Sequence, residues 1–247
     1  MTTKNIKING LHGKPILIDV FSNGNSADKP VVIFAHGFKG FKDWGHFNLM
    51  AEKFAEAGFV FVKFNFSYNG TTPENPQDFA DLEAFGNNNF SIEQDDLKCV
   101  IDWVTSDSFP AKEESDTSSI SLIGHSRGGG GVILKASQDK RIKKVVAWAA
   151  VDRFDRFWSE ELVAEWKQTG VQYIYNGRTK QQMPLYYQFY EDFVSNRKKL
   201  DVQAAAAEMK IPFLIIHGTT DEAVKYDAAT NLPVSYTHLT LPTNGCV

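Results

Sequence analysis

Short apolar runs alternate with segments whose apolar residues recur at helical spacing along most of this sequence. A typical case is residues 44–57, where apolar side chains lie three or four positions apart and Gly58 follows the predicted helix. The short, continuous apolar runs favour strands that are buried on both faces of a sheet. The predicted strands of this kind are residues 31–35, 59–66, 120–123, 145–151 and 213–217. The alternation favours a doubly wound, mostly parallel sheet with helices on both faces.

The start of the chain and one internal stretch depart from this alternation. Residues 6–8 and 16–21 flank a glycine-containing turn, which favours an antiparallel hairpin. Residues 69–89 are rich in Asn, Pro, Asp and Gly and predict a long loop. Ser91 then serves as the expected N-cap of a helix. One face of that helix carries Leu97, Val100, Ile101 and Val104.

Residues 152–210 form a further exception, with many Glu, Lys, Tyr and Trp residues. We interpret this segment as a mostly helical insertion, because this composition argues against sheet. A chain of 247 residues suffices for one large α/β domain, which we expect to span residues 1–233.

Composition narrows the possible partners. The net charge is −4 and no basic stripe stands out, so no nucleic-acid partner is expected. No apolar run reaches the length of a membrane span and the N-terminus lacks a signal-peptide core, which predicts a cytoplasmic protein with no membrane partner. Cys99 and Cys246 make no disulfide framework, and no His and Cys pair has zinc-ligand spacing. The oligomeric state stays open.

The chemistry-bearing motif of the chain is Gly124-His125-Ser126-Arg127-Gly128, directly after a predicted strand. A strand that ends in Gly-x-Ser-x-Gly and opens into a helix is typical of a nucleophile elbow. The serine at such a turn is held above the sheet edge, at the N-terminus of a helix whose dipole favours a developing negative charge. The alternative is a glycine-rich turn with an incidental serine.

Two further motifs follow predicted strands, namely His36-Gly37-Phe38 and His217-Gly218-Thr219-Thr220-Asp221. Together the three motifs resemble the α/β-hydrolase superfamily over about residues 14–230. Within it, the sequence is most similar to bacterial single-domain esterases and peptidase-like hydrolases with a small helical cap. The resemblance implies an α/β-hydrolase fold with a helical cap at about residues 152–210, a small-molecule acyl substrate, and neither cofactor nor metal.

The resemblance also implies roles for individual residues. Ser126 would be the nucleophile, and the backbone N–H groups of Phe38 and Arg127 would form the oxyanion hole. Asp221 would orient the catalytic histidine, with Asp152 as the alternative acid. His36 is expected to be structural.

The same residues are compatible with more than one class of reaction. Hydrolysis of an ester through a serine acyl-enzyme is the first expectation. The alternatives are a serine peptidase of the prolyl-oligopeptidase or aminopeptidase type, an acyltransferase or thioesterase, and a non-catalytic binding protein on a hydrolase scaffold. The aromatic cap suits an apolar or aromatic acyl group, although most of its rings are expected to pack the cap on the body.

The C-terminal residues break the resemblance. Residues 234–243 resemble the in-frame translation of a transposase sequencing adapter, so we expect residues 234–247 to be a non-native tail. The last strand and last helix of the fold would then be missing. His238 is the one histidine after Asp221, where the superfamily keeps its base. We therefore expect this chain to be inactive because it lacks the catalytic histidine.

Overall fold

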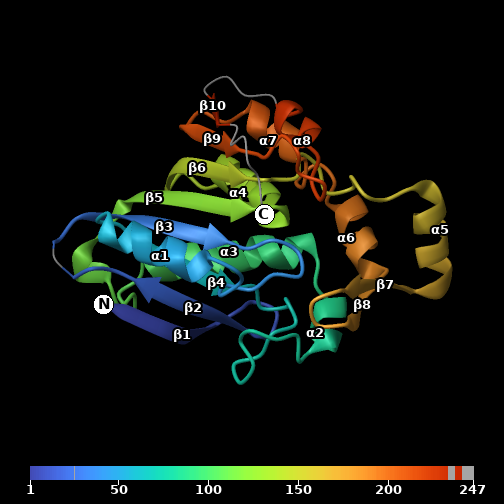
Figure 1. Ribbon diagram of the computed structural model, residues 1–247, viewed down its shortest axis with the longest axis horizontal. Coiled ribbons are helices and arrows are strands. Elements are labelled where there is room, and N and C mark those ends of the chain that lie inside the picture. The colour runs from blue at the N-terminus through green and yellow to red at the C-terminus, as the bar shows by residue number, and fades with distance from the viewer. Residues whose placement is uncertain (25, 233–236, 241–247) are drawn as a thin grey trace.

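An eight-stranded sheet forms the centre of the fold in the computed structural model, which describes residues 1–24, 26–232 and 237–240 (Figure 1). The spatial order is β1-β2-β4-β3-β5-β6-β9-β10. β2 runs antiparallel to both of its neighbours, and the other pairs are parallel. The strands are β1 (Thr2–Asn9), β2 (Pro15–Phe21), β3 (Lys29–Ala35), β4 (Val60–Asn65), β5 (Ser115–His125), β6 (Ile142–Trp148), β9 (Phe213–Ile216) and β10 (Thr237–Thr240). The predicted mostly parallel sheet and its N-terminal hairpin are confirmed.

Helices cover both faces of the sheet. On one face α1 (Phe47–Glu56) packs Phe47 against Phe34, with their ring centroids 4.4 Å apart. The other face carries α3 (Phe90–Val104) and α4 (Arg127–Gln138), whose buried apolar residues belong to the larger of the two core clusters. Shorter helical segments are α2 (Leu82–Gly86), η1 (Lys112–Glu114), α7 (Val202–Ala207), which packs against α4, and α8 (Asp227–Thr230).

The start of α3 differs in detail from the prediction. Its buried face is as predicted, but its N-cap is Asn89 and not Ser91. The side chain of Asn89 accepts the Ile92 N–H at 2.9 Å, whereas Ser91 Oγ lies 2.6 Å from Asp192 Oδ1. The helix therefore begins two residues earlier, and Ser91 links it to the inserted segment.

The segment between β6 and β9 contains sheet as well as helix. α5 (Glu160–Thr169) and α6 (Gln188–Ser195) flank an antiparallel hairpin of β7 (Val171–Asn176) and β8 (Gln181–Tyr186). The expectation that its composition excludes sheet is therefore wrong. Tyrosine and β-branched residues favour strands, and they alternate along β7. Within the segment, α5, β7, β8 and α6 lie together at one end of the sheet (Figure 1), where β8 packs against α2 and α6 against α3. We call residues 152–200 the cap.

The far edge of the sheet also differs from expectation. Residues 237–240 form β10, which pairs in parallel with β9, so a strand lies at the edge where the last strand was expected to be missing. That residues 234–247 are a non-native tail stays a prediction. An edge strand presents unpaired N–H and C=O groups that a neighbouring segment can join, and Thr237 and Thr240 suit a strand. The expectation of a missing last helix falls on residues outside the described ones. Of the helices in the described ranges, none combines the length and hydropathy needed to cross a bilayer.

Candidate active site

Ser126 lies at the turn from β5 into α4 with φ 55° and ψ −120°. Residues other than glycine rarely adopt this backbone conformation, which costs about 1–3 kcal/mol. Contacts on both sides hold it in place: the Ser126 N–H donates to Trp148 O at 2.9 Å, and its carbonyl accepts the Gly129 N–H at 2.9 Å. The structure thus places the serine at a strained strand-to-helix turn, as the motif predicts.

The flanking glycines are needed because the chain passes very close to itself here. A Cβ at Gly124 would lie 2.3 Å from Gly128 O, and a Cβ at Gly128 would lie 2.4 Å from His36 O. Both distances are shorter than non-bonded atoms allow. The Gly-x-Ser-x-Gly pattern is therefore a steric requirement of this turn.

The loop that follows β3 lies directly beside Ser126. A Cβ on Gly37 would stand 2.9 Å from Ser126 Cβ, which brings the His36-Gly37-Phe38 motif next to the serine. His36 is buried and its Nδ1 lies 2.9 Å from Gly37 O. Its Nε2 faces the Phe66 N–H at 3.4 Å, so Nε2 accepts and Nδ1 carries the proton. Burial lowers the pKa of His36 to about 4, and this neutral ring fastens the loop.

The side chain of Arg127 was not singled out from the sequence. Its guanidinium lies over the ring of Phe38 with 4.4 Å to the centroid, and it also faces the rings of Phe90 and Phe189. It forms an ion pair with the buried Glu93. Burial lowers the pKa of Arg127, and the charge of Glu93 opposes this effect. Arg127 therefore ties the elbow to α3, the loop after β3 and the cap.

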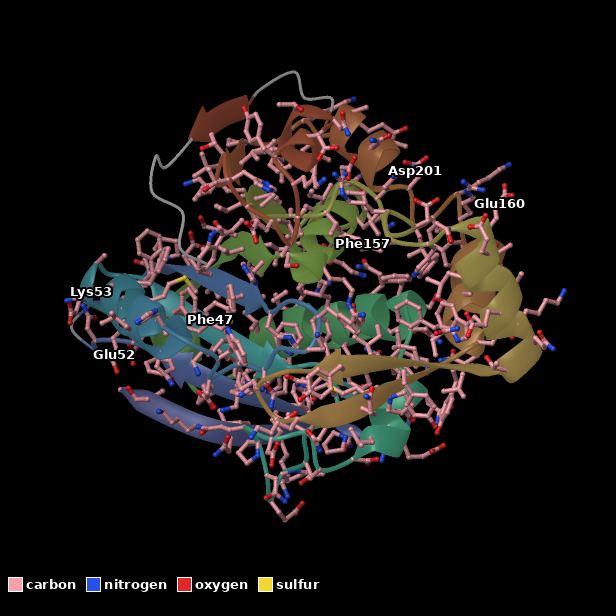
Figure 2. The ribbon with its side chains drawn as sticks, turned by 45° about the vertical axis from the view of Figure 1, so that its right-hand side comes forward. Phe47, Glu52, Lys53, Phe157, Glu160 and Asp201 are labelled. Carbon is pink, nitrogen blue, oxygen red and sulfur yellow. The ribbon has the colours of Figure 1, made fainter. Side chains whose placement is uncertain are left out.

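A pocket of about 390 Å³ opens at Ser126 between the body and the cap. Its wall is mainly aromatic and aliphatic, as expected of a small-molecule site. Phe157 lies between α4 and the cap helices in Figure 2, and 61% of its surface is exposed. The lining residues that matter below are Phe38, Phe90, Ser126, Phe157, Trp158 and Phe189.

The aromatic residues of the cap divide between pocket, core and surface. Trp166 and Phe193 are buried, whereas Tyr173 and Tyr175 are 60% and 55% exposed on the outer side of β7. Trp158 lines the pocket and packs edge-on against Phe193. The expectation that the aromatic rings of the cap pack it on the body therefore holds for only some of these rings.

The two candidate acids differ in how their carboxylates are occupied. Asp152 is fully buried and accepts from Arg156 at 2.7 Å, with further amide donors from Gln203 and Asn231. Asp221 lies in the loop after β9, where its Oδ1 accepts the Ala223 and Val224 N–H groups at 2.9 and 3.0 Å. Asp221 Oδ2 carries no hydrogen bond from the described residues, while every oxygen of Asp152 is engaged.

The histidines near the elbow are held by other contacts. His125 packs its ring against Trp148 at 4.9 Å, and burial lowers its pKa to about 4. His217 is buried with Nε2 2.7 Å from Val224 O, and 3.9 Å from Asp221 Oδ2. Within the described side chains, no histidine forms a hydrogen bond with Ser126. The backbone of His238 pairs with Leu214 inside β10, and its side chain lies outside the described residues.

Comparison with solved structures places this fold among hydrolases. Ferulic acid-bound Est1E from Butyrivibrio proteoclasticus is 18% identical with a TM-score of 0.71, over 96% of this chain and 88% of that one. A protein from Agrobacterium vitis S4 that is described only as a hydrolase is 20% identical with a TM-score of 0.71, over 99% of this chain and 90% of that one. The α/β hydrolase GrgF from Penicillium sp. sh18 is 13% identical with a TM-score of 0.71, over 98% and 89%. At these identities the likeness concerns the fold.

No curated protein matches the sequence. The model of the dienelactone hydrolase family matches residues 19–238, which include all three motifs and the whole of β3, β4, β5, β6 and β9. The chain belongs to the dienelactone hydrolase family, within the α/β hydrolases.

Proposed function

We propose that this protein is a serine-dependent carboxylester hydrolase. Ser126 Oγ attacks the acyl carbon, the alcohol leaves with a proton, and water then releases the acid from the acyl-enzyme. The observation that carries this proposal is the strained backbone of Ser126 at the β5–α4 turn, with Gly37 packed against its Cβ. Strain of this kind persists only where surrounding contacts enforce it, and it gathers at catalytic positions.

In this proposal the negative charge of the tetrahedral intermediate meets the backbone N–H groups of Phe38 and Arg127. Phe38 directly follows Gly37, and Arg127 is the first residue of α4. A donor of this kind contributes up to about 3–4 kcal/mol in the transition state. The N-terminus of α4 adds a favourable dipole.

We assign the acid role to Asp221 and not to Asp152. Support comes from Asp221 Oδ2, which has no hydrogen-bond donor among the described residues, whereas Asp152 is bound by Arg156 and two amides. An acid at this position would accept from the ring of a base that follows it in the chain.

The base itself is absent from the described side chains, so we propose that this chain turns over slowly. His238 pairs with Leu214, two positions before the end of β9, and three strand spacings separate β10 from β5. At about 4.8 Å a spacing, that is roughly 14 Å across the sheet. Loss of a triad member lowers the rate by about four to six powers of ten.

The pocket favours an apolar or aromatic acyl group, because Phe38, Phe90 and Trp158 line it beside Ser126. Est1E, of similar fold, has been solved with ferulic acid bound, an aromatic carboxylic acid. We therefore propose aromatic carboxylic esters as preferred over acetates.

Turnover of p-nitrophenyl acetate and p-nitrophenyl cinnamate tests the proposal. We expect slow p-nitrophenol release that Ser126→Ala abolishes, a preference for cinnamate, and no effect of His238→Ala. Release that survives Ser126→Ala would refute the serine mechanism. Fast release that His238→Ala abolishes would make His238 the base and refute the assignment of low activity.

A further inference from the structure

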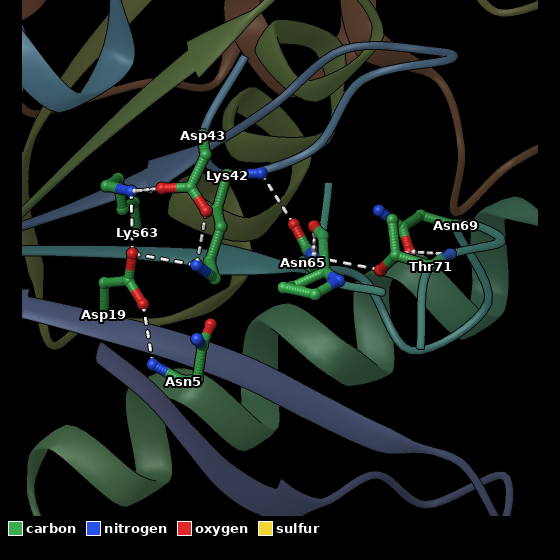
Figure 3. Close-up of polar contacts among 9 residues, drawn as sticks. Asn5, Asp19, Lys42, Asp43, Lys63, Asn65, Asn69 and Thr71 are labelled. Carbon is green, nitrogen blue, oxygen red and sulfur yellow. Dashed lines mark hydrogen bonds and ion pairs between the residues drawn. The ribbon is translucent and has the colours of Figure 1, made fainter. Parts of the chain in front are cut away.

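Four charged side chains form a closed ring beneath the loop that follows β3 (Figure 3). Lys42 and Lys63 each pair with both Asp19 and Asp43. The Lys42–Asp19 and Lys63–Asp19 contacts are 2.9 and 2.8 Å, and Lys42–Asp43 is 2.6 Å. Side-chain exposure is 0% for Asp19, Lys42 and Lys63 and 4% for Asp43, so solvent takes almost no part.

The ring joins the loop to two strands of the sheet. Asp19 on β2 and Lys63 on β4 are directly paired residues of adjacent strands. Lys42 and Asp43 belong to the loop, which leaves β3 at His36 and passes Ser126 at Gly37. The ring therefore fastens the far side of the loop to the body.

Backbone contacts hold the same stretch. The Lys42 N–H donates to Asn65 Oδ1 at 2.6 Å, and Asn69 Nδ2 donates to Gly40 O at 3.2 Å. His36 fixes the other end. Only five residues lie between His36 and Lys42, and Phe38 is one of them. The position of the Phe38 N–H is thus set by anchors on both sides.

Stability alone does not account for four buried charges. Taking each ion out of water costs several kcal/mol, and well-packed apolar residues in place of a buried ion pair are often as stable or more so. Burial would raise the pKa of Asp43, but hydrogen bonds from Lys42 and Lys63 hold it below its ordinary value, so this carboxylate is ionised. What such a ring supplies is fixed geometry, because each charge has two opposite partners at defined positions.

We propose that Lys42 and Asp43 are positioning residues that, with Asp19 and Lys63, hold the Phe38 N–H in register for the oxyanion of the Ser126 reaction. The inference rests on the proposed function and adds residues that do not touch the substrate. Removing the Lys42 ammonium leaves two buried carboxylates for one ammonium, and the loop shifts to relieve the excess charge. The oxyanion donor then moves with the loop, while the aromatic residues of the pocket that lie outside the loop, Phe90, Trp158 and Phe189, stay.

The test is the rate of covalent labelling by an alkyl fluorophosphonate, which accumulates even when the serine reacts slowly. Concentration dependence separates the binding constant KI from the rate constant kinact. We expect Lys42→Met to lower kinact at least tenfold and to change KI less than about twofold, because an oxyanion donor acts in the transition state.

Lys29→Met is the matched control. Lys29 is equally buried and pairs with Glu114 at 2.8 Å, but it sits at the amino end of β3, away from the loop. The Lys29→Met variant loses a buried ammonium in the same way, so its melting temperature should fall, while its kinact and KI stay within twofold of those of the unaltered chain.

A second variant separates positioning from folding. Lys42→Met/Asp43→Asn leaves Asp19 and Lys63 as a neutral pair, so it regains stability relative to Lys42→Met, yet its kinact should stay low. Equal kinact in Lys42→Met and Lys29→Met, or recovery of kinact in the double variant, would overturn the positioning role and leave the proposed function standing. Labelling that persists in Ser126→Ala, or none at all, would overturn the proposed function and the inference with it.

Discussion

Replacing the strained serine with glycine should stabilise this protein relative to replacing it with alanine. Ser126 has φ 55° and ψ −120°, a conformation that glycine adopts freely and alanine does not. Ser126→Ala and Ser126→Gly both remove the hydroxyl, so their difference isolates the Cβ. Strain at such a position is worth about 1–3 kcal/mol. The greater backbone freedom of glycine in the unfolded chain offsets about 0.5–1 kcal/mol of it.

Ser137 serves as a control position at which glycine should be less favourable than alanine. It is exposed near the end of α4, in ordinary helical backbone, where glycine is about 1 kcal/mol worse than alanine. The glycine-minus-alanine difference at Ser126 should therefore exceed that at Ser137 by roughly 1–3 kcal/mol, which is the strain itself. In a domain of 247 residues each kcal/mol shifts the melting temperature by about 2–4 °C.

Chemical unfolding in urea of the four variants measures both differences, with melting curves as a second probe. If glycine is as unfavourable at Ser126 as it is at Ser137, the backbone at the elbow stores no strain and the reasoning from its dihedral angles fails.

Two further predictions concern the elbow and the core. Gly128→Ala should abolish labelling of Ser126 and lower the melting temperature, because the new Cβ would lie 2.4 Å from His36 O; a melting temperature and labelling rate like those of the unaltered chain would show that the turn has room. Burial raises the pKa of Asp96 to about 7, above its unfolded value of 3.8, so its native form holds the extra proton and stability falls as pH rises between these values. Asp96→Asn cannot ionise, so its free energy of unfolding relative to the unaltered chain should gain on the order of 4 kcal/mol between pH 4 and pH 8, and a difference independent of pH would contradict this.

The sequence predicted the parts of the site that depend on local backbone geometry. The Gly-x-Ser-x-Gly turn, the glycine beside it and the strand ends carry their signal in residue type and order, since few residues fit such close approaches. The β7–β8 hairpin was not predicted from the sequence, because the many Glu, Lys, Tyr and Trp residues of this segment argued against sheet. Tyr173 and Tyr175 nevertheless alternate with buried or half-buried neighbours, as strand residues do.

The buried ring was missed for a different reason. Asp19 and Lys63 each stand inside an apolar strand, which is a signal that a buried partner must exist. Their partners Lys42 and Asp43 lie in a loop, and only tertiary structure brings that loop to them. The contacts of the Arg127 side chain are likewise long-range, since Glu93 and Phe189 come from separate elements.

The most direct test of the central claim is the site at which an alkyl fluorophosphonate bonds to this chain. Mass spectrometry of the digested adduct should find one phosphonyl group on Ser126, and none in Ser126→Ala or after heat unfolding. A phosphonyl group on another serine, or undiminished labelling of Ser126→Ala, would contradict Ser126 as the nucleophile of a serine hydrolase.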